Sequence, residues 1–115
     1  MKRKEFKIKE AEYAYTGGGI YVIVGELENG NFFMHDASFY DTRILTERPD
    51  FENDDVWYPE WQEEHLIEDL NTKKDGAFFF LQAYKWIKKN IEGYDKYLDY
   101  IAEDAEKLKS KSKRR

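Results

Sequence analysis

The chain has 115 residues, carries 24 Asp and Glu against 19 Lys and Arg, and contains no cysteine. This length fits one domain with a buried core, and the lack of cysteine excludes disulfides, thiolate zinc sites and a cysteine nucleophile. Aromatic residues make up 17% of the chain, which favours a folded domain over disorder although 37% of the residues are charged.

The longest apolar runs, over residues 20–24 and 77–81, are too short to cross a bilayer. The basic start of the chain lacks the apolar segment of a secretory signal. We therefore expect a soluble, cytoplasmic protein.

The first four predicted elements are strands. Apolar residues alternate over residues 5–15 and change face near Glu10, which predicts a strand with a bulge. Three glycines, residues 17–19, then lead into a strand that is apolar on both faces, as a central strand is. A phosphate cradle would need a helix after these glycines.

Asn29-Gly30 favours a tight hairpin turn before a third strand over residues 32–36, and a fourth strand is predicted over residues 39–45. Four successive strands predict a small antiparallel meander.

From Thr46 the pattern changes to a turn-rich loop, and Pro59 favours the start of an acidic helix. The spacing of this helix predicts two opposite faces. The apolar face would hold Leu66, Ile67 and Leu70, and the polar face Trp61, Glu64, His65 and Glu68.

Two further helices are predicted after residue 70. Asp75 would cap a core helix over residues 76–92, and Gly93 would separate it from an amphipathic terminal helix. The two could form a hairpin or one bent rod. The expected fold is therefore α+β: a small four-stranded antiparallel sheet followed by an acidic helix and two further helices, in one domain over residues 1–109. Residues 110–115 are expected to be a basic flexible tail.

Charge is distributed unevenly along the chain. Residues 26–69 hold fourteen carboxylates and only two arginines, whereas residues 1–9 and 107–115 hold eleven Lys or Arg and one Glu. The acidic middle would repel nucleic acid and attract basic surfaces. The basic ends would serve solubility, with weak contact to phosphates as the alternative.

Catalytic signatures are weak. The two histidines, His35 and His65, each have an ordinary structural explanation. His65 with Glu68 and Asp69 could offer metal ligands on one helical face, but a solvated face is the preferred interpretation. The carboxylates are too numerous to single out an acid–base pair, and residues 52–55 lack the spacing of a calcium loop. No catalytic residue, metal ligand or cofactor is predicted.

The acidic segment, residues 47–69, carries the one functional signal, because aromatic residues stand among its ten carboxylates. Aromatic anchors on a charged rim are typical of protein interfaces. A merely solubilising face is the alternative. The predicted partner-binding residues are Asp50, Glu52, Asp54, Asp55, Trp57, Tyr58, Glu60, Trp61, Glu63, Glu64 and Glu68.

These residues predict a non-enzymatic binding protein, a stoichiometric inhibitor whose carboxylates replace phosphates in the basic groove of a DNA- or RNA-handling protein. In size, charge and lack of cysteine the chain resembles small acidic proteins of phages and mobile elements, including anti-CRISPR and anti-restriction inhibitors; no motif carries this likeness. One alternative is an interaction or self-association module that uses an apolar patch around Phe78, Phe79 and Trp86. Another is a small enzyme with an unusual site. The partner's identity and the oligomeric state are left open.

Overall fold

The computed structural model describes residues 6–17, 20–70 and 72–110. Its strands form one antiparallel sheet in sequence order: β1 (Ile8–Gly17), β2 (Ile20–Leu27), β3 (Phe32–Asp36), β4 (Asp41–Leu45) and β5 (Leu66–Leu70). The helices are α1 (Pro59–Glu64), α2 (Lys73–Asn90) and α3 (Tyr97–Ser110), with a 3-10 turn η1 (Asp54–Trp57). The predicted α+β fold with an antiparallel sheet is confirmed.

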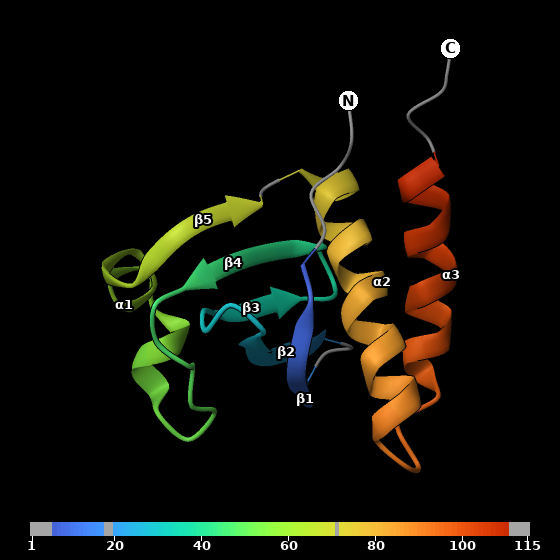
Figure 1. The fold of residues 1–115 in the computed structure, drawn as a ribbon, viewed down its shortest axis with the longest axis horizontal. Coiled ribbons are helices and arrows are strands. Elements are labelled where there is room, and N and C mark those ends of the chain that lie inside the picture. Colours follow the sequence, from blue (N-terminus) through green and yellow to red (C-terminus); the bar gives the residue numbers. More distant parts are fainter. Residues whose placement is uncertain (1–5, 18–19, 71, 111–115) are drawn as a thin grey trace.

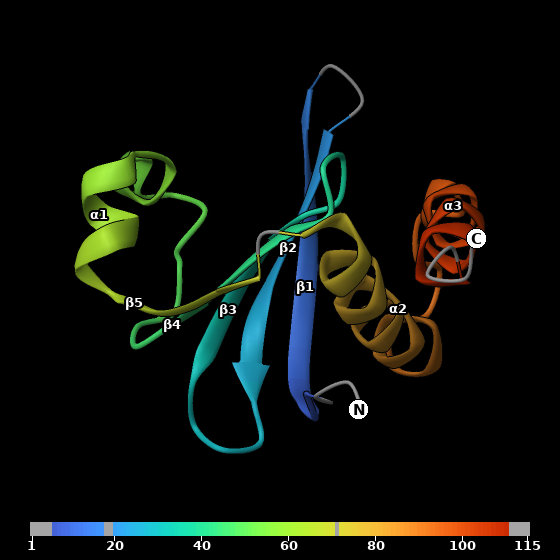
Figure 2. The ribbon, with the colours of Figure 1, turned by 90° about the horizontal axis from the view of Figure 1, so that it is seen from above.

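The sheet lies between two unequal layers. Helix α2 lies against one face with α3 packed on α2, and η1 with α1 lies on the other face (Figures 1 and 2). Ile23, Phe33 and Ile44 belong to the larger core under α2, whereas their neighbours Val24, Met34 and Leu45 belong to a second, smaller core. Both faces of β2 are therefore buried, as its sequence predicts.

The predicted number of strands is wrong, because the sheet has five strands and not four. The predicted acidic helix stops at Glu64, and residues 66–70 pair with β4, with Leu66 opposite Leu45 and Leu70 opposite Thr42. Apolar residues at 66, 67 and 70 fit a helical period as well as a strand. Residues 66–70 form a strand because the edge of β4 offers backbone groups to pair with. The local spacing of apolar residues holds no information about this partner.

The predicted hairpin features hold. The register of β1 against β2 shifts between Ile8 and Glu10, where the sequence predicts a bulge. Gly30 has a φ of 94°, as a tight turn requires. The predicted start of β1 at residue 5 and glycines 18 and 19 lie outside the described residues. Strand β4 begins at Asp41, not at residue 39, because Tyr40 adopts a turn with a φ of 55°.

Helix α2 begins earlier than predicted. Thr72 is its N-cap, and the Thr72 hydroxyl accepts a hydrogen bond from the Asp75 amide at 3.2 Å, so Asp75 lies inside the helix. The helix ends at Asn90 instead of residue 92. A Cβ atom at Gly76 would lie 1.5 Å from the Tyr40 carbonyl oxygen, so only glycine allows this close packing of α2 on the turn.

Helices α2 and α3 form a hairpin, side by side in both views (Figures 1 and 2). Gly93, with a φ of 75°, lies in the connection. Ser110 belongs to α3, although the predicted tail begins there, and the rest of that tail, residues 111–115, lies outside the described residues. None of the described helices combines the length and the apolar character needed to cross a membrane.

Candidate functional site

The acidic segment folds as a cap over the second face of the sheet. Val56 of η1 is fully buried, in one cluster with Val22, Val24, Met34 and Leu45. Phe51 and Trp61 pack against the edge of this cluster. Burial of one valine and parts of two aromatic rings therefore holds a strongly charged segment in place.

Local hydrogen bonds order the predicted turn-rich loop. The Asp50 carboxylate accepts the Glu52 amide at 2.9 Å, and the Asn53 side chain accepts the Asp55 amide at 3.0 Å. Across the cap, the Gln62 side-chain amide donates to the Val56 carbonyl at 2.8 Å. The loop is thus a defined structure, in which one carboxylate of the predicted site, that of Asp50, has a structural role.

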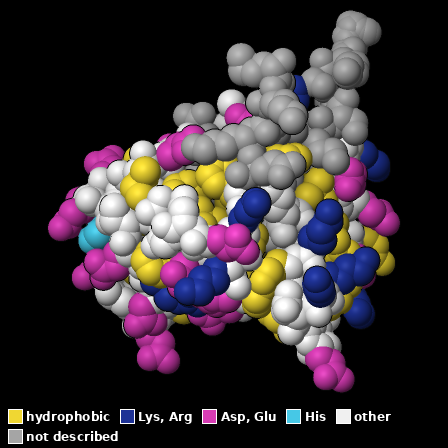
Figure 3. All heavy atoms as spheres, viewed as in Figure 1, with side chains coloured by type: hydrophobic (Ala, Val, Ile, Leu, Met, Phe, Trp, Pro, Cys, Tyr) yellow, Lys and Arg dark blue, Asp and Glu magenta, His cyan; other side chains and the backbone are white. Residues whose placement is uncertain are grey.

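A shallow hollow of about 290 Å³ opens on the outer side of this cap. Its lining consists of three carboxylates and two aromatic rings, all of them predicted partner-binding residues: Asp55, Tyr58, Glu60, Trp61 and Glu64. In Figure 3, acidic side chains crowd the side of the molecule where Figure 1 places α1. Carboxylates beside aromatic faces suit a cation, by charge and by cation–π attraction.

Among the residues that the structure describes, no cation neutralises this hollow. Arg48 is the only Lys or Arg in the acidic segment, and it turns towards β1, where it binds Glu10 and lies 2.6 Å from the Glu12 carboxylate. Among the described residues, no ion pair involves Asp55, Glu60 or Glu64. The hollow therefore keeps its negative charge.

The spacing predicts Trp61 beside Glu64 on a polar helix face, and both residues do line the hollow. Trp61 is not a purely polar-face residue, however. Its ring packs on the second core and lies 4.4 Å, centroid to centroid, from the ring of His65. The Nδ1 atom of His65 donates to the Trp61 carbonyl at 2.8 Å, and its Nε2 atom lies 3.2 Å from the Glu47 carboxylate. The predicted apolar face is wrong, because Leu66 and Ile67 are exposed on β5.

The remaining predicted residues do not line the hollow. Trp57 is 38% exposed and stacks on Phe51, with 6.1 Å between the ring centroids. It directly precedes Tyr58, which lines the hollow and is 58% exposed. Glu52 and Glu63 are exposed, whereas Glu68 lies on β5, opposite Ile44. Asp54 belongs to η1, but its side chain lies outside the described part of the structure.

The other histidine of the chain, His35, lies inside the core. His35 is completely buried, its Nδ1 atom lies 2.6 Å from the Thr42 hydroxyl, and burial lowers its pKa to about 3. No substrate can reach it. Within the described ranges, no three His, Asp or Glu side chains are placed to hold a metal ion. The alternative metal site of His65, Glu68 and Asp69 would need these residues on one helical face, but α1 ends at Glu64, before all three.

A second feature was not predicted from the sequence: a groove between β1 and α2 whose lining includes Lys9, Lys85 and Lys89. The sequence does hold one sign of this groove, because Lys85 and Lys89 lie one helical turn apart and close to Trp86. Their meeting with β1 depends on the fold.

A scan against protein-family models gave no match, and searches of the curated proteins and of the solved structures found none either. The function of this chain is therefore inferred from its own geometry and charge.

Proposed function

We propose that the protein is a non-enzymatic binding protein whose acidic hollow receives a Lys or Arg side chain from a basic protein surface. One observation carries this proposal: three carboxylates and two aromatic rings line one hollow, and no described cation compensates them. A purely solubilising surface accounts for the charges but not for aromatic walls among them.

Arginine fits this hollow particularly well. Its planar guanidinium can bind one carboxylate through two hydrogen bonds and stack on an aromatic face at the same time. Tyr58 and Trp61 offer such faces, and Glu60 and Glu64 offer carboxylates. The exposed part of Trp57 next to the hollow adds an apolar anchor.

The partner class we propose is a DNA- or RNA-handling protein, bound at its nucleic-acid groove. Such grooves present arranged Arg and Lys side chains, so a compact acidic surface can occupy them in place of phosphates. The fourteen carboxylates of residues 26–69 would steer the approach. The resemblance in size and charge to phage and mobile-element inhibitors supports a stoichiometric inhibitor of this kind.

Competition with nucleic acid tests the partner class. The immobilised protein is incubated with a nuclease-treated bacterial lysate, and each captured protein is then challenged in purified form with excess duplex DNA or RNA. We expect the main captured protein to bind nucleic acid by itself. We also expect excess nucleic acid to release this protein from the immobilised chain. A captured protein that ignores excess nucleic acid would contradict groove occupancy.

A further inference from the structure

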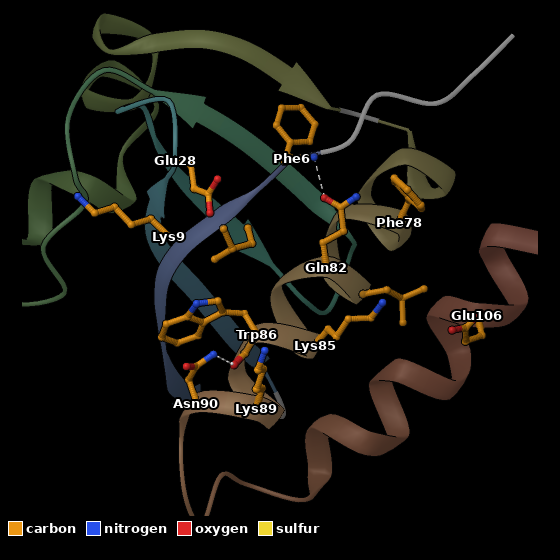
Figure 4. A pocket seen from close by; sticks show the side chains of 12 residues that line it. Phe6, Lys9, Glu28, Phe78, Gln82, Lys85, Trp86, Lys89, Asn90 and Glu106 are labelled. Carbon is orange, nitrogen blue, oxygen red and sulfur yellow. Dashed lines mark hydrogen bonds between the residues drawn. The ribbon is translucent and has the colours of Figure 1, made fainter.

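A groove of about 620 Å³ runs between the edge strand β1 and helix α2. Its lining combines apolar and charged side chains from both elements and from α3 (Figure 4): Phe6, Ile8, Lys9, Glu28, Phe78, Leu81, Gln82, Lys85, Trp86, Lys89, Asn90 and Glu106. The Phe6 amide donates to the Gln82 side chain at 2.8 Å, which ties the residues just before β1 to α2 at one end of the groove.

The groove has an apolar wall and a charged rim, in which three lysines outnumber the two glutamates Glu28 and Glu106. Phe6 and Trp86 are only partly buried and pack against the large core. Lys85 and Lys89 are exposed on successive turns of α2, and no ion pair joins either to another described side chain. Lys9 pairs with Glu26 at 3.6 Å. The predicted apolar patch is only partly available here, because Phe79 is fully buried in the core.

This groove complements the acidic cap in charge and in aromatic content. The cap presents Glu60 and Glu64 beside the exposed Tyr58, and the groove presents Lys85 and Lys89 beside Trp86. In Figure 3, several Lys and Arg side chains gather where Figure 1 places α2, and acidic side chains crowd the opposite side and also occur near α3. The sheet separates the two surfaces (Figure 2), so they can meet only between two molecules.

We propose that the groove receives the acidic cap of a second copy of this chain. Tyr58 and Trp57 of one molecule pack against the apolar wall of the groove, and Glu60 and Glu64 meet Lys85 and Lys89 of the next molecule. The chain's own basic end is a poor occupant, because residues 107–115 carry six Lys or Arg and no acid.

Such a contact is head-to-tail, since it joins two different surfaces of the same molecule. It generates a ring if the rotation closes and an open chain if it does not. Each contact also covers one acidic hollow. This step rests on the proposed function: self-association then competes with the basic partner for the hollow, and dilution releases monomers that can bind the partner.

Sedimentation velocity over a concentration series tests the contact. The wild type should associate as its concentration rises, and Lys85→Glu/Lys89→Glu and Glu60→Lys/Glu64→Lys should each weaken association at least about tenfold, because like charges then face each other. An equimolar mixture of the two variants should associate again, since each supplies the charge that the other lacks. Lys73→Glu/Lys74→Glu changes the net charge as Lys85→Glu/Lys89→Glu does, but outside the groove, and should behave as the wild type. Circular dichroism verifies the fold of each variant.

A wild type that stays monomeric up to millimolar concentration would overturn the inference, and so would association that survives in Lys85→Glu/Lys89→Glu. Neither result affects the proposed function, because capture of a basic partner by the acidic hollow does not need Lys85 or Lys89. The two proposals can thus fail separately. If the wild type and Glu60→Lys/Glu64→Lys were both monomeric and only the variant lost capture of the basic partner, the proposed function would stand and the self-association would be ruled out.

Discussion

Arg48 joins the acidic cap to β1, the edge strand on the far side of the sheet, with its guanidinium 2.6 Å from the Glu12 carboxylate. The same side chain also binds Glu10. This arrangement has two consequences. It fastens the start of the cap, and it keeps the segment's single arginine away from the hollow.

Replacing Arg48 should therefore loosen the cap. Arg48→Met should lower the free energy of unfolding by about 1 kcal/mol, because a partly exposed charge pair with good geometry contributes on that scale. Urea unfolding measures the change. Arg43→Met serves as a control, since Arg43 only approaches Asp41 at 3.5 Å, and it should cost less. Equal losses in the two variants would contradict a fastening role for Arg48.

Val56 should be the main apolar anchor of the cap. Val56→Ala removes two methyl groups from a fully buried site and should cost about 2 kcal/mol in unfolding free energy. Ile67→Ala is the matched control, because Ile67 is 47% exposed, and it should change stability by no more than about 0.5 kcal/mol. If Val56→Ala were as mild as this control, the cap would not depend on the second core.

His35 should make the protein sensitive to acid. Burial lowers its pKa from 6.5 to about 3, and its Nε2 atom has no hydrogen-bond partner among the described residues. The folded state thus holds a neutral ring that protonates more readily after unfolding. This contribution to stability is complete above about pH 6.5 and is lost as the pH falls towards 3, by at most about 1.4 kcal/mol per pH unit.

Unfolding curves at about pH 6.5 and about pH 5 isolate this effect, because most carboxylates remain ionised in that window. The measurement uses a His65→Gln background, so that His35 is the only histidine. Adding His35→Gln should flatten the pH dependence, whatever its own cost in stability. A dependence that persists without His35 would refute this assignment.

Asp99 should hold the hairpin of α2 and α3 together. The hydroxyls of Tyr84 and Tyr94 donate to the same Asp99 oxygen, at 2.5 and 2.8 Å. The Tyr84 bond and then the Tyr94 bond lower the pKa of Asp99, and burial, followed by the bond to Asp99, raises the pKa of Tyr84.

Tyr84→Phe and Tyr94→Phe should each cost about 1 kcal/mol in thermal or urea unfolding. Their effects should not add, because they share one acceptor atom. Tyr100→Phe, at a residue that is 67% exposed, should be neutral. Strict additivity in the double variant would show that the two hydrogen bonds act independently.

The sequence predicts β1 to β4 well because their signals are local. The shift of face near Glu10 and the Asn29-Gly30 turn can both be read from neighbouring residues. Strand β5 could not be predicted in this way. Its residues satisfy a helical period, and only the free edge of β4 favours a strand.

The candidate site was predicted in part for a similar reason. Charge and aromatic content identified all five residues of the hollow. Local spacing did not predict that Trp61 also packs on the second core, because that contact joins residues far apart in the sequence. The groove was harder to predict. It forms where β1 meets α2, and the contact from Phe6 to Gln82 spans 76 positions in the sequence.

The central claim is that the hollow binds a basic protein surface, and a capture assay tests it most directly. The wild type is compared with Asp55→Lys/Glu60→Lys/Glu64→Lys and with Glu92→Lys/Glu103→Lys/Asp104→Lys, which has the same net charge but leaves the hollow intact. We predict that the first variant loses the captured partner and that the second retains it, with capture by the wild type weakening as salt shortens the Debye length from about 10 Å at 0.1 M to about 3 Å at 1 M. Equal capture by the wild type and both variants would contradict the claim.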